Sequence, residues 1–160
     1  MPGDLAMTRE GRRVSVGCVF GLLCFAGCGT TSSPPAVSTP TVLQIAGRWA
    51  GTASDSSGPG TMAWTLTQNS TNVSGSVEIA TPLRTVVMTG TIAGTLSGSA
   101  LAWRLDIPAG GVSGQPTCAV TVTGTSTIAV NGLTMDGSYS GTGSCTPAFT
   151  NGAVSLTKQS

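Results

Sequence analysis

The sequence contains no histidine among its 160 residues. Without an imidazole the chain has neither a Ser-His-Asp nor a Cys-His nucleophilic system, and it has no histidine ligand for a metal ion. A glycine-rich phosphate loop would precede a helix, and no helical pattern is evident. We therefore expect no enzyme activity, with no catalytic residue, no metal site and no cofactor.

Charged residues are also scarce, at 8% of the chain. From Cys28 onward four basic residues balance four acidic ones, and neither sign is clustered. A nucleic-acid partner would need a basic stripe, so we expect none. The acidic residues are Asp55, which falls in an expected loop, and Glu78, Asp106 and Asp136, which fall on outward phases of expected strands. We interpret all four as solvated surface charge and not as paired catalytic carboxylates.

No apolar run is long enough to cross a membrane as a helix, which needs about 20 residues for ~30 Å of hydrocarbon. The apolar run at residues 14–26 has instead the length of the hydrophobic region of a signal peptide. Arg9, Arg12 and Arg13 precede it and supply the basic region that such peptides begin with. We therefore interpret residues 1–27 as a signal peptide for export.

The segment Phe25-Ala26-Gly27-Cys28 ends this run. It resembles the lipobox of bacterial lipoproteins, in which small residues precede a cysteine that is diacylated and becomes the new N-terminus; Phe25 stands where leucine is usual. The resemblance implies lipidation at Cys28 and a membrane as partner, since acyl chains at ~0.8 kcal/mol per buried methylene make a lasting anchor. Gly29 and not aspartate follows Cys28, and the resemblance to lipoprotein sorting then implies the outer membrane. The alternative is an ordinary secretory signal with an incidental cysteine.

Residues 28–43 hold this cysteine and a stretch rich in Thr, Ser and Pro, with no aromatic and no charged residue. Such a composition cannot build a core, so we interpret it as a disordered tether that holds the rest of the chain away from the bilayer. Residues 44–160 then form a single folded domain.

From about residue 44 the apolar residues recur with a period of two, which predicts β-strands. The low charge and the many β-branched residues favour an all-β domain as well. The expected strands cover residues 45–53, 61–68, 72–79, 86–96 and 101–107, the two arms between Cys118 and Cys145, and residues 153–158. Eight sequential strands with short turns predict an antiparallel up-and-down meander that closes into a barrel and so removes its edges. A sandwich of two four-stranded sheets is the alternative.

Asn131-Gly132 is the strongest turn signal, because a two-residue hairpin loop needs positive φ at both positions. Partners across this turn have residue numbers that sum to 263, which places Cys118 opposite Cys145. This pairing predicts a disulfide formed in an oxidising compartment, and two buried free thiols are the alternative. A turn at Gly98-Ser99 predicts a second hairpin, whose partners sum to 197.

Four bulky residues, Trp49, Trp64, Trp103 and Tyr139, fall on the inward phase of the expected strands. They form a candidate pocket that would stack on a small ligand. The alternative is that the three tryptophans and their aliphatic neighbours are the core itself. Lys158 takes the inward phase of the last strand, and barrel closure would place its ammonium group over the Trp49 indole.

The segment Gly47-Arg48-Trp49 resembles the Gly-x-Trp opening of the calycins, which are the lipocalin and avidin barrels. The resemblance implies a small β-barrel that binds a hydrophobic molecule inside it. Avidins place an asparagine two residues after the tryptophan, where this chain has Gly51, so the resemblance does not extend to biotin binding.

Two classes of function follow from these observations. The first is a non-catalytic, lipid-anchored lipoprotein of the bacterial cell envelope with a structural or interaction role, partnered by another envelope protein. The alternative is a calycin-like binder of a small hydrophobic ligand inside the barrel. A cavity of ~300 Å³ or more against the tryptophans would favour the binder, and a filled interior would favour the first class.

Overall fold

The computed structural model describes residues 42–81 and 85–160. The expected signal peptide (1–27), Cys28 and the tether up to residue 41 lie outside the described residues. Within the described ranges, no helix is long and apolar enough to cross a membrane.

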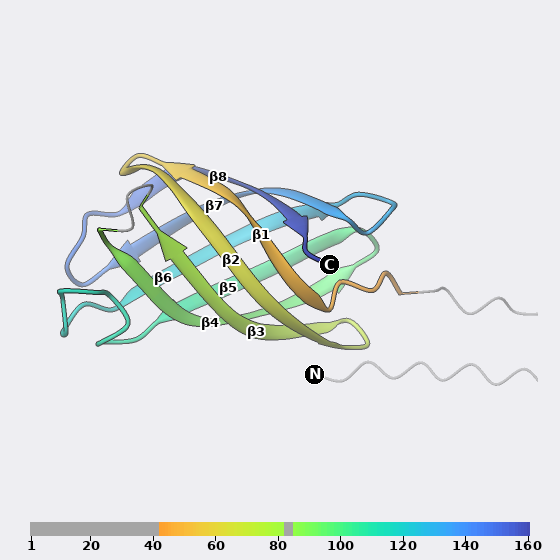
Figure 1. Cartoon of the computed structure of the whole chain (residues 1–160), viewed down its shortest axis with the longest axis horizontal. Helices are drawn as coiled ribbons and strands as arrows, with labels where there is room; N and C mark the ends of the chain where they lie inside the picture. The colour runs from red at the N-terminus through yellow and green to blue at the C-terminus, as the bar shows by residue number, and fades with distance from the viewer. Residues whose placement is uncertain (1–41, 82–84) are drawn as a thin grey trace, which may run out of the picture. The chain divides into compact units, whose positions relative to one another are not determined.

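Eight β-strands follow one another along the described chain (Figure 1). They are β1 (Gly47–Asp55), β2 (Gly58–Asn69), β3 (Asn72–Ala80), β4 (Val87–Ser97), β5 (Ala100–Ile107), β6 (Val120–Ile128), β7 (Thr134–Gly143) and β8 (Phe149–Lys158). Each strand pairs with the next and β8 pairs with β1, all of them antiparallel, so the sheet closes on itself. The predicted all-β, up-and-down barrel is therefore confirmed, and the two-sheet sandwich is excluded.

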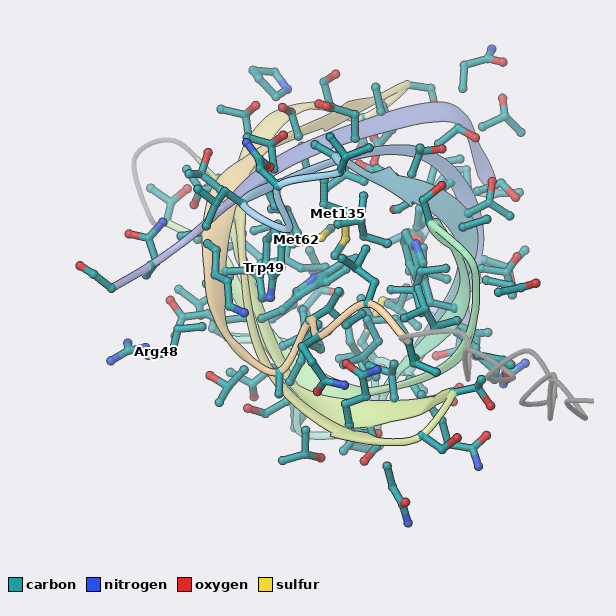
Figure 2. The ribbon with its side chains drawn as sticks, turned by 90° about the vertical axis from the view of Figure 1, so that its right-hand side faces the viewer. Arg48, Trp49, Met62 and Met135 are labelled. Atoms are coloured by element: carbon teal, nitrogen blue, oxygen red, sulfur yellow. A yellow bond between two sulfur atoms is a disulfide. The ribbon has the colours of Figure 1, made fainter. Side chains whose placement is uncertain are left out.

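The first and last strands close the barrel through a regular ladder from Trp49↔Lys158 to Ser54↔Ala153. Side chains along each strand alternate between the interior and the surface, as a pleated strand dictates. Figure 2 shows the result down the barrel axis, with Trp49, Met62 and Met135 inside the ring and Arg48 outside it. Period-two patterning in the sequence thus translates directly into an apolar interior and a polar outer surface.

Both predicted hairpin registers are confirmed. The β6–β7 ladder runs from Val120↔Gly143 to Ile128↔Met135, so its pairs sum to 263. The β4–β5 ladder ends at Ser97↔Ala100, so its pairs sum to 197.

The loop at Asn131-Gly132 is longer than predicted. The ladder closes at Ala129, whose amide donates to the Thr134 carbonyl, which leaves four residues in the loop. Of the loop residues, Gly132 has a positive φ, at 69°, and Asn131 does not; the Asn131 side chain accepts a hydrogen bond from the Leu133 amide at 2.9 Å. The prediction of a two-residue loop was therefore wrong, although the register it implied is right.

The expected loop at residues 55–60 is also corrected. β1 continues to Asp55 and β2 begins at Gly58, so only Ser56 and Ser57 form the turn. The Asp55 carboxylate accepts hydrogen bonds from both the amide and the hydroxyl of Ser57, which stabilises this tight turn. A polar Asp-Ser-Ser-Gly composition is typical of loops, and here it serves a hairpin turn and the strand ends beside it.

β8 begins earlier than expected, at Phe149. The register of the β7–β8 ladder shifts between Tyr139 and Gly141, beside Asn151, which has φ 56°. The neighbouring β6–β7 ladder is regular over its whole length.

Residues 42–46 cover one end of the barrel, which we call the closed end. Ile45 is fully buried there, and Val42 and Leu43 pack against the core. The Gln68 side chain holds this segment, since it accepts from the Ile45 amide at 2.7 Å and donates to the Leu43 carbonyl at 2.9 Å. The packed domain thus includes Val42 and Leu43, which the sequence had assigned to the tether.

Lys158 lies at the same closed end. Its Nζ atom is 5.8 Å from the centroid of the Trp49 ring, as predicted from the inward phase of the last strand. The indole nitrogen of Trp49 donates to the Ile45 carbonyl at 2.8 Å, so segment, tryptophan and lysine pack as one unit.

Candidate functional site

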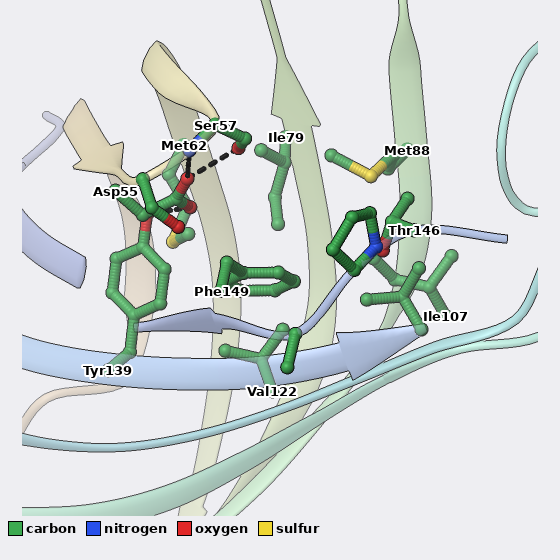
Figure 3. Close-up of a pocket in the computed structure, with 14 residues that line it drawn as sticks. Asp55, Ser57, Met62, Ile79, Met88, Ile107, Val122, Tyr139, Thr146 and Phe149 are labelled. Carbon is green, nitrogen blue, oxygen red and sulfur yellow. Dashed lines mark hydrogen bonds between the residues drawn. The ribbon is translucent and has the colours of Figure 1, made fainter. Parts of the chain in front are cut away.

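The opposite end of the barrel, which we call the mouth, contains a cavity of about 260 Å³ (Figure 3). The mouth carries the turn at residues 56–57, the end of β3, the start of β4, and the loops at 108–119 and 144–148. Most of the cavity wall is apolar, from Met62, Ile79 and Met88 on one side to Val122 and Phe149 on the other. The cavity therefore suits a small and largely apolar molecule.

The interior is hollow at the mouth because inward side chains become smaller toward that end. Along the paired strands β1 and β2, the inward positions read Trp49 with Trp64, Gly51 with Met62, and Ala53 with Gly60. β7 continues the trend, since Gly141 and Gly143 follow Tyr139 on its inner face. Large residues fill the half of the barrel near the closed end, and too little side-chain volume remains to fill the mouth.

Asp55 projects into the mouth from the last position of β1. Its Oδ2 atom accepts a hydrogen bond of 2.9 Å from the hydroxyl of Tyr139 on β7. Its Oδ1 atom accepts from the amide and the hydroxyl of Ser57. Burial raises the pKa of the Tyr139 phenol above its ordinary value, and the hydrogen bond and negative charge of Asp55 raise it further. Tyr139 therefore remains a protonated donor through neutral and moderately alkaline pH.

A row of aromatic rings leads from the core to this cavity. Trp64 and Trp103 meet edge to face with centroids 5.1 Å apart, and Tyr139 lies 6.3 Å beyond Trp103. Phe149 follows at 6.2 Å from Tyr139, again edge to face. Each such pair contributes ~0.5–1.5 kcal/mol beyond its buried area. The rings of Tyr139 and Phe149 in the cavity wall are therefore held in place by contacts that continue into the core.

The predicted disulfide between Cys118 and Cys145 is present and stabilises the rim of the mouth. Its Cα atoms are 5.3 Å apart. Next to it, Ser144 exchanges two hydrogen bonds with Ala119, one through its backbone amide and one through its hydroxyl. These links hold the loop at residues 144–148, which supplies Thr146, Pro147 and Ala148 to the cavity wall.

The four residues of the predicted pocket have separate roles. Tyr139 lines the cavity, whereas Trp49, Trp64 and Trp103 do not line it and belong to the buried core. Trp103 donates from its indole nitrogen to the buried hydroxyl of Ser126 at 3.0 Å, and the indole nitrogen of Trp64 has no partner among the described residues. The tryptophans are therefore buried packing residues of the core.

Asp55 is the site residue that the sequence interpretation missed. It was assigned to a loop and to solvated surface charge, but it continues the inward phase of Trp49, Gly51 and Ala53. That parity was the available signal, and the loop-like composition obscured it. Asp106, by contrast, does lie on the outer face, where it forms an exposed ion pair of 2.7 Å with Arg104.

The site combines an apolar cavity with one carboxylate and one phenol. Among the described residues, no cluster of three or more His, Cys, Asp or Glu side chains is arranged to hold a metal ion. Cys28, the predicted lipidation site, lies outside the described residues. In comparisons with known proteins, no family model, no curated protein and no solved structure matches this chain.

Proposed function

We propose that this chain is an exported, non-catalytic lipoprotein of the bacterial cell envelope whose barrel binds a small, largely apolar molecule in its mouth. The cavity beside Tyr139 is the observation that supports binding. Its volume is about 260 Å³. This volume is below the ~300 Å³ at which a cavity against the tryptophans would favour a binder, and the cavity lies at the mouth beside Tyr139 instead, so the proposal is limited to a small ligand bound there.

The position of the cavity also supports this proposal. The chain enters the barrel through residues 42–46 at the closed end, and the cavity opens at the other end. A ligand can therefore reach the cavity without passing the segment through which the chain enters the barrel.

The lipid anchor rests on the lipobox-like segment that ends at Cys28. Radiolabelled palmitate fed to the expressing bacterium should label the wild type but not the Cys28→Ala variant. Cys24→Ala is the matched control, because it removes a cysteine of the same apolar run and should keep the label. Label retained in Cys28→Ala would overturn this part of the proposal, and fractionation of the labelled protein would test the outer membrane as its location.

Binding can be tested with 2-(4-fluorophenyl)ethanol, a small neutral probe whose fluorine signal broadens and shifts in the bound state. We expect the wild-type domain to bind it and Ala148→Trp to lose binding, because an indole on the rim would fill the mouth. Ala153→Trp places the same ring on the outer face of β8 and should bind like the wild type. Equal binding by all three proteins would show that the probe sits elsewhere.

A structural or interaction role without a ligand is the second candidate. The observation that favours it is the filled core around Trp49, Trp64 and Trp103, each at most 4% exposed. Mass spectrometry of the protein purified from its own host distinguishes the two. A small molecule that copurifies with the wild type but not with Ala148→Trp supports ligand binding. A wild-type protein that copurifies with no small molecule and does not bind the fluorinated probe supports the structural role.

A further inference from the structure

We infer that the molecule bound in the mouth carries a positively charged amino group, which pairs with the carboxylate of Asp55 while its apolar part fills the cavity. This inference rests on the proposed binding function and narrows it to amphipathic amines. Of the described residues that line the cavity, Asp55 carries a charge and all the others are neutral.

The hydrogen bonds of Asp55 leave room for such a partner. An ionised carboxylate has about four acceptor positions. Ser57 occupies both positions of Oδ1, through its amide and its hydroxyl, and Tyr139 occupies one position of Oδ2. A second position on Oδ2 remains for a donor, and an ammonium group is the donor that also balances the charge.

The surroundings of the carboxylate favour a cation as well. Phe149 also lines the cavity, and a ring face attracts a cation within about 6 Å of its centroid; Tyr139 meets Asp55 through its hydroxyl at the ring edge. The described cation nearest to the barrel interior, Lys158, lies at the closed end over Trp49 and is not part of the cavity wall. No described side chain in this lining therefore neutralises Asp55.

The turn at residues 56–57 does not by itself explain how Asp55 is placed. Closing that turn requires only the two bonds from Ser57 to Oδ1. The bond from Tyr139 to Oδ2 requires the carboxylate to project inward across the mouth. In the competing account, the bond between Asp55 and Tyr139 only joins β1 to β7 and Asp55 contacts no ligand. Binding measurements distinguish this account from ours.

The test compares three probes that share one ring and differ in charge: 2-(4-fluorophenyl)ethylamine, 2-(4-fluorophenyl)ethanol and 4-fluorophenylacetate. Their affinities for the wild type and for Asp55→Asn would be measured by fluorine NMR titration at neutral pH. For the wild type we expect the amine to bind about tenfold or more tightly than the alcohol, the ratio that a charge-assisted hydrogen bond supplies. The acetate should bind most weakly.

Asp55→Asn keeps the size of the side chain: its carbonyl oxygen can accept from Ser57, and its NH2 group can donate to the Tyr139 hydroxyl, which then acts as the acceptor. It should abolish the preference for the amine, measured as the ratio of the amine affinity to the alcohol affinity within each protein. A salt titration of the wild type gives a second measurement that needs no variant, since only the amine should lose affinity as ionic strength rises.

The outcomes are distinguishable. If the wild type binds amine and alcohol equally, or if Asp55→Asn keeps the preference for the amine, the inference is wrong and the proposed binding function stands. If none of the three probes binds the wild-type mouth, the proposed function itself is wrong and the inference is overturned with it.

Discussion

Tyr139 of β7 donates its phenolic hydrogen to Oδ2 of Asp55 at the end of β1, over a sequence separation of 84 residues and a distance of 2.9 Å. These two strands are not neighbours in the sheet, because β8 lies between them. The bond therefore links the two strands on either side of β8 at the mouth of the barrel, and it fixes the position of the only tyrosine in the chain.

This bond predicts a loss of stability at alkaline pH. Burial and Asp55 raise the pKa of Tyr139 in the folded state above its ordinary value of 10.0. The resulting stability is fully present below the unfolded pKa and is lost as pH rises toward the folded pKa. We expect the free energy of unfolding to decline above pH ~10 in the wild type and to lack this component in Tyr139→Phe. Urea denaturation at several pH values measures it, and tyrosinate absorbance appearing near the ordinary pKa in the native protein would contradict it.

Gly124 leaves space for the Trp103 ring. A Cβ atom at this position would lie 2.4 Å from Cζ2 of Trp103 and 2.6 Å from the Ser138 carbonyl oxygen. We expect Gly124→Ala to lower the free energy of unfolding by about 1–3 kcal/mol, as overpacking does. Thr125→Ala, on the outer face next to it, should change stability by at most about 0.5 kcal/mol. Trp103→Phe should cost less in the Gly124→Ala background than in the wild type, and additive effects would contradict the clash.

Reduction of the Cys118–Cys145 disulfide should destabilise the domain. With a sequence separation of 27, the chain-entropy account of cross-linking assigns it ~3.5 kcal/mol. Small domains have only ~5–15 kcal/mol of stability in total, so the denaturation midpoint should fall markedly under reducing conditions. The double Cys→Ala variant should match the reduced protein. Two reactive thiols in the unfolded, unreduced domain would show that the bond does not form.

Lys158 should contribute through its cation–π contact with Trp49. Lys158→Met keeps much of the aliphatic side chain and removes the ammonium group that lies 5.8 Å from the ring. We expect a loss of about 0.5–1 kcal/mol, the range for a partly exposed contact. Lys158→Arg should retain the stability, and Arg48→Met, which removes the same charge from the outer face, should leave it nearly unchanged. An unchanged midpoint in Lys158→Met would contradict the contribution.

The barrel and its registers could be predicted from the sequence because two local signals determine them. Inward and outward residues alternate strictly, and turns at Gly98-Ser99 and Asn131-Gly132 mark where pairing begins. A shift of one residue would turn every apolar side chain of a strand to the surface, so these registers have no close competitor. The pairing of Cys118 with Cys145 follows from the same arithmetic.

The cavity could not be predicted in this way. Alternation shows which side chains point inward. It does not show how much of the interior these side chains fill at each level along the barrel axis. The rim residues Thr146, Pro147 and Ala148 come from a loop without periodicity, and Asp55 was hidden by a composition typical of loops. Sequence reasoning therefore placed the candidate pocket at the largest inward residues, where the space is in fact filled.

The pairing of β1 with β8 has a kinetic consequence. The ladder joins Trp49 to Lys158, so closure waits for residues from opposite ends of the domain to meet. Such long-range pairing is slow, because the entropy of loop closure is lost before the contacts form. Until β8 docks, β1 and β7 are edge strands with unpaired backbone groups that template association with other chains. A newly made chain is thus most prone to aggregate in the interval before the ten residues of β8 join the sheet.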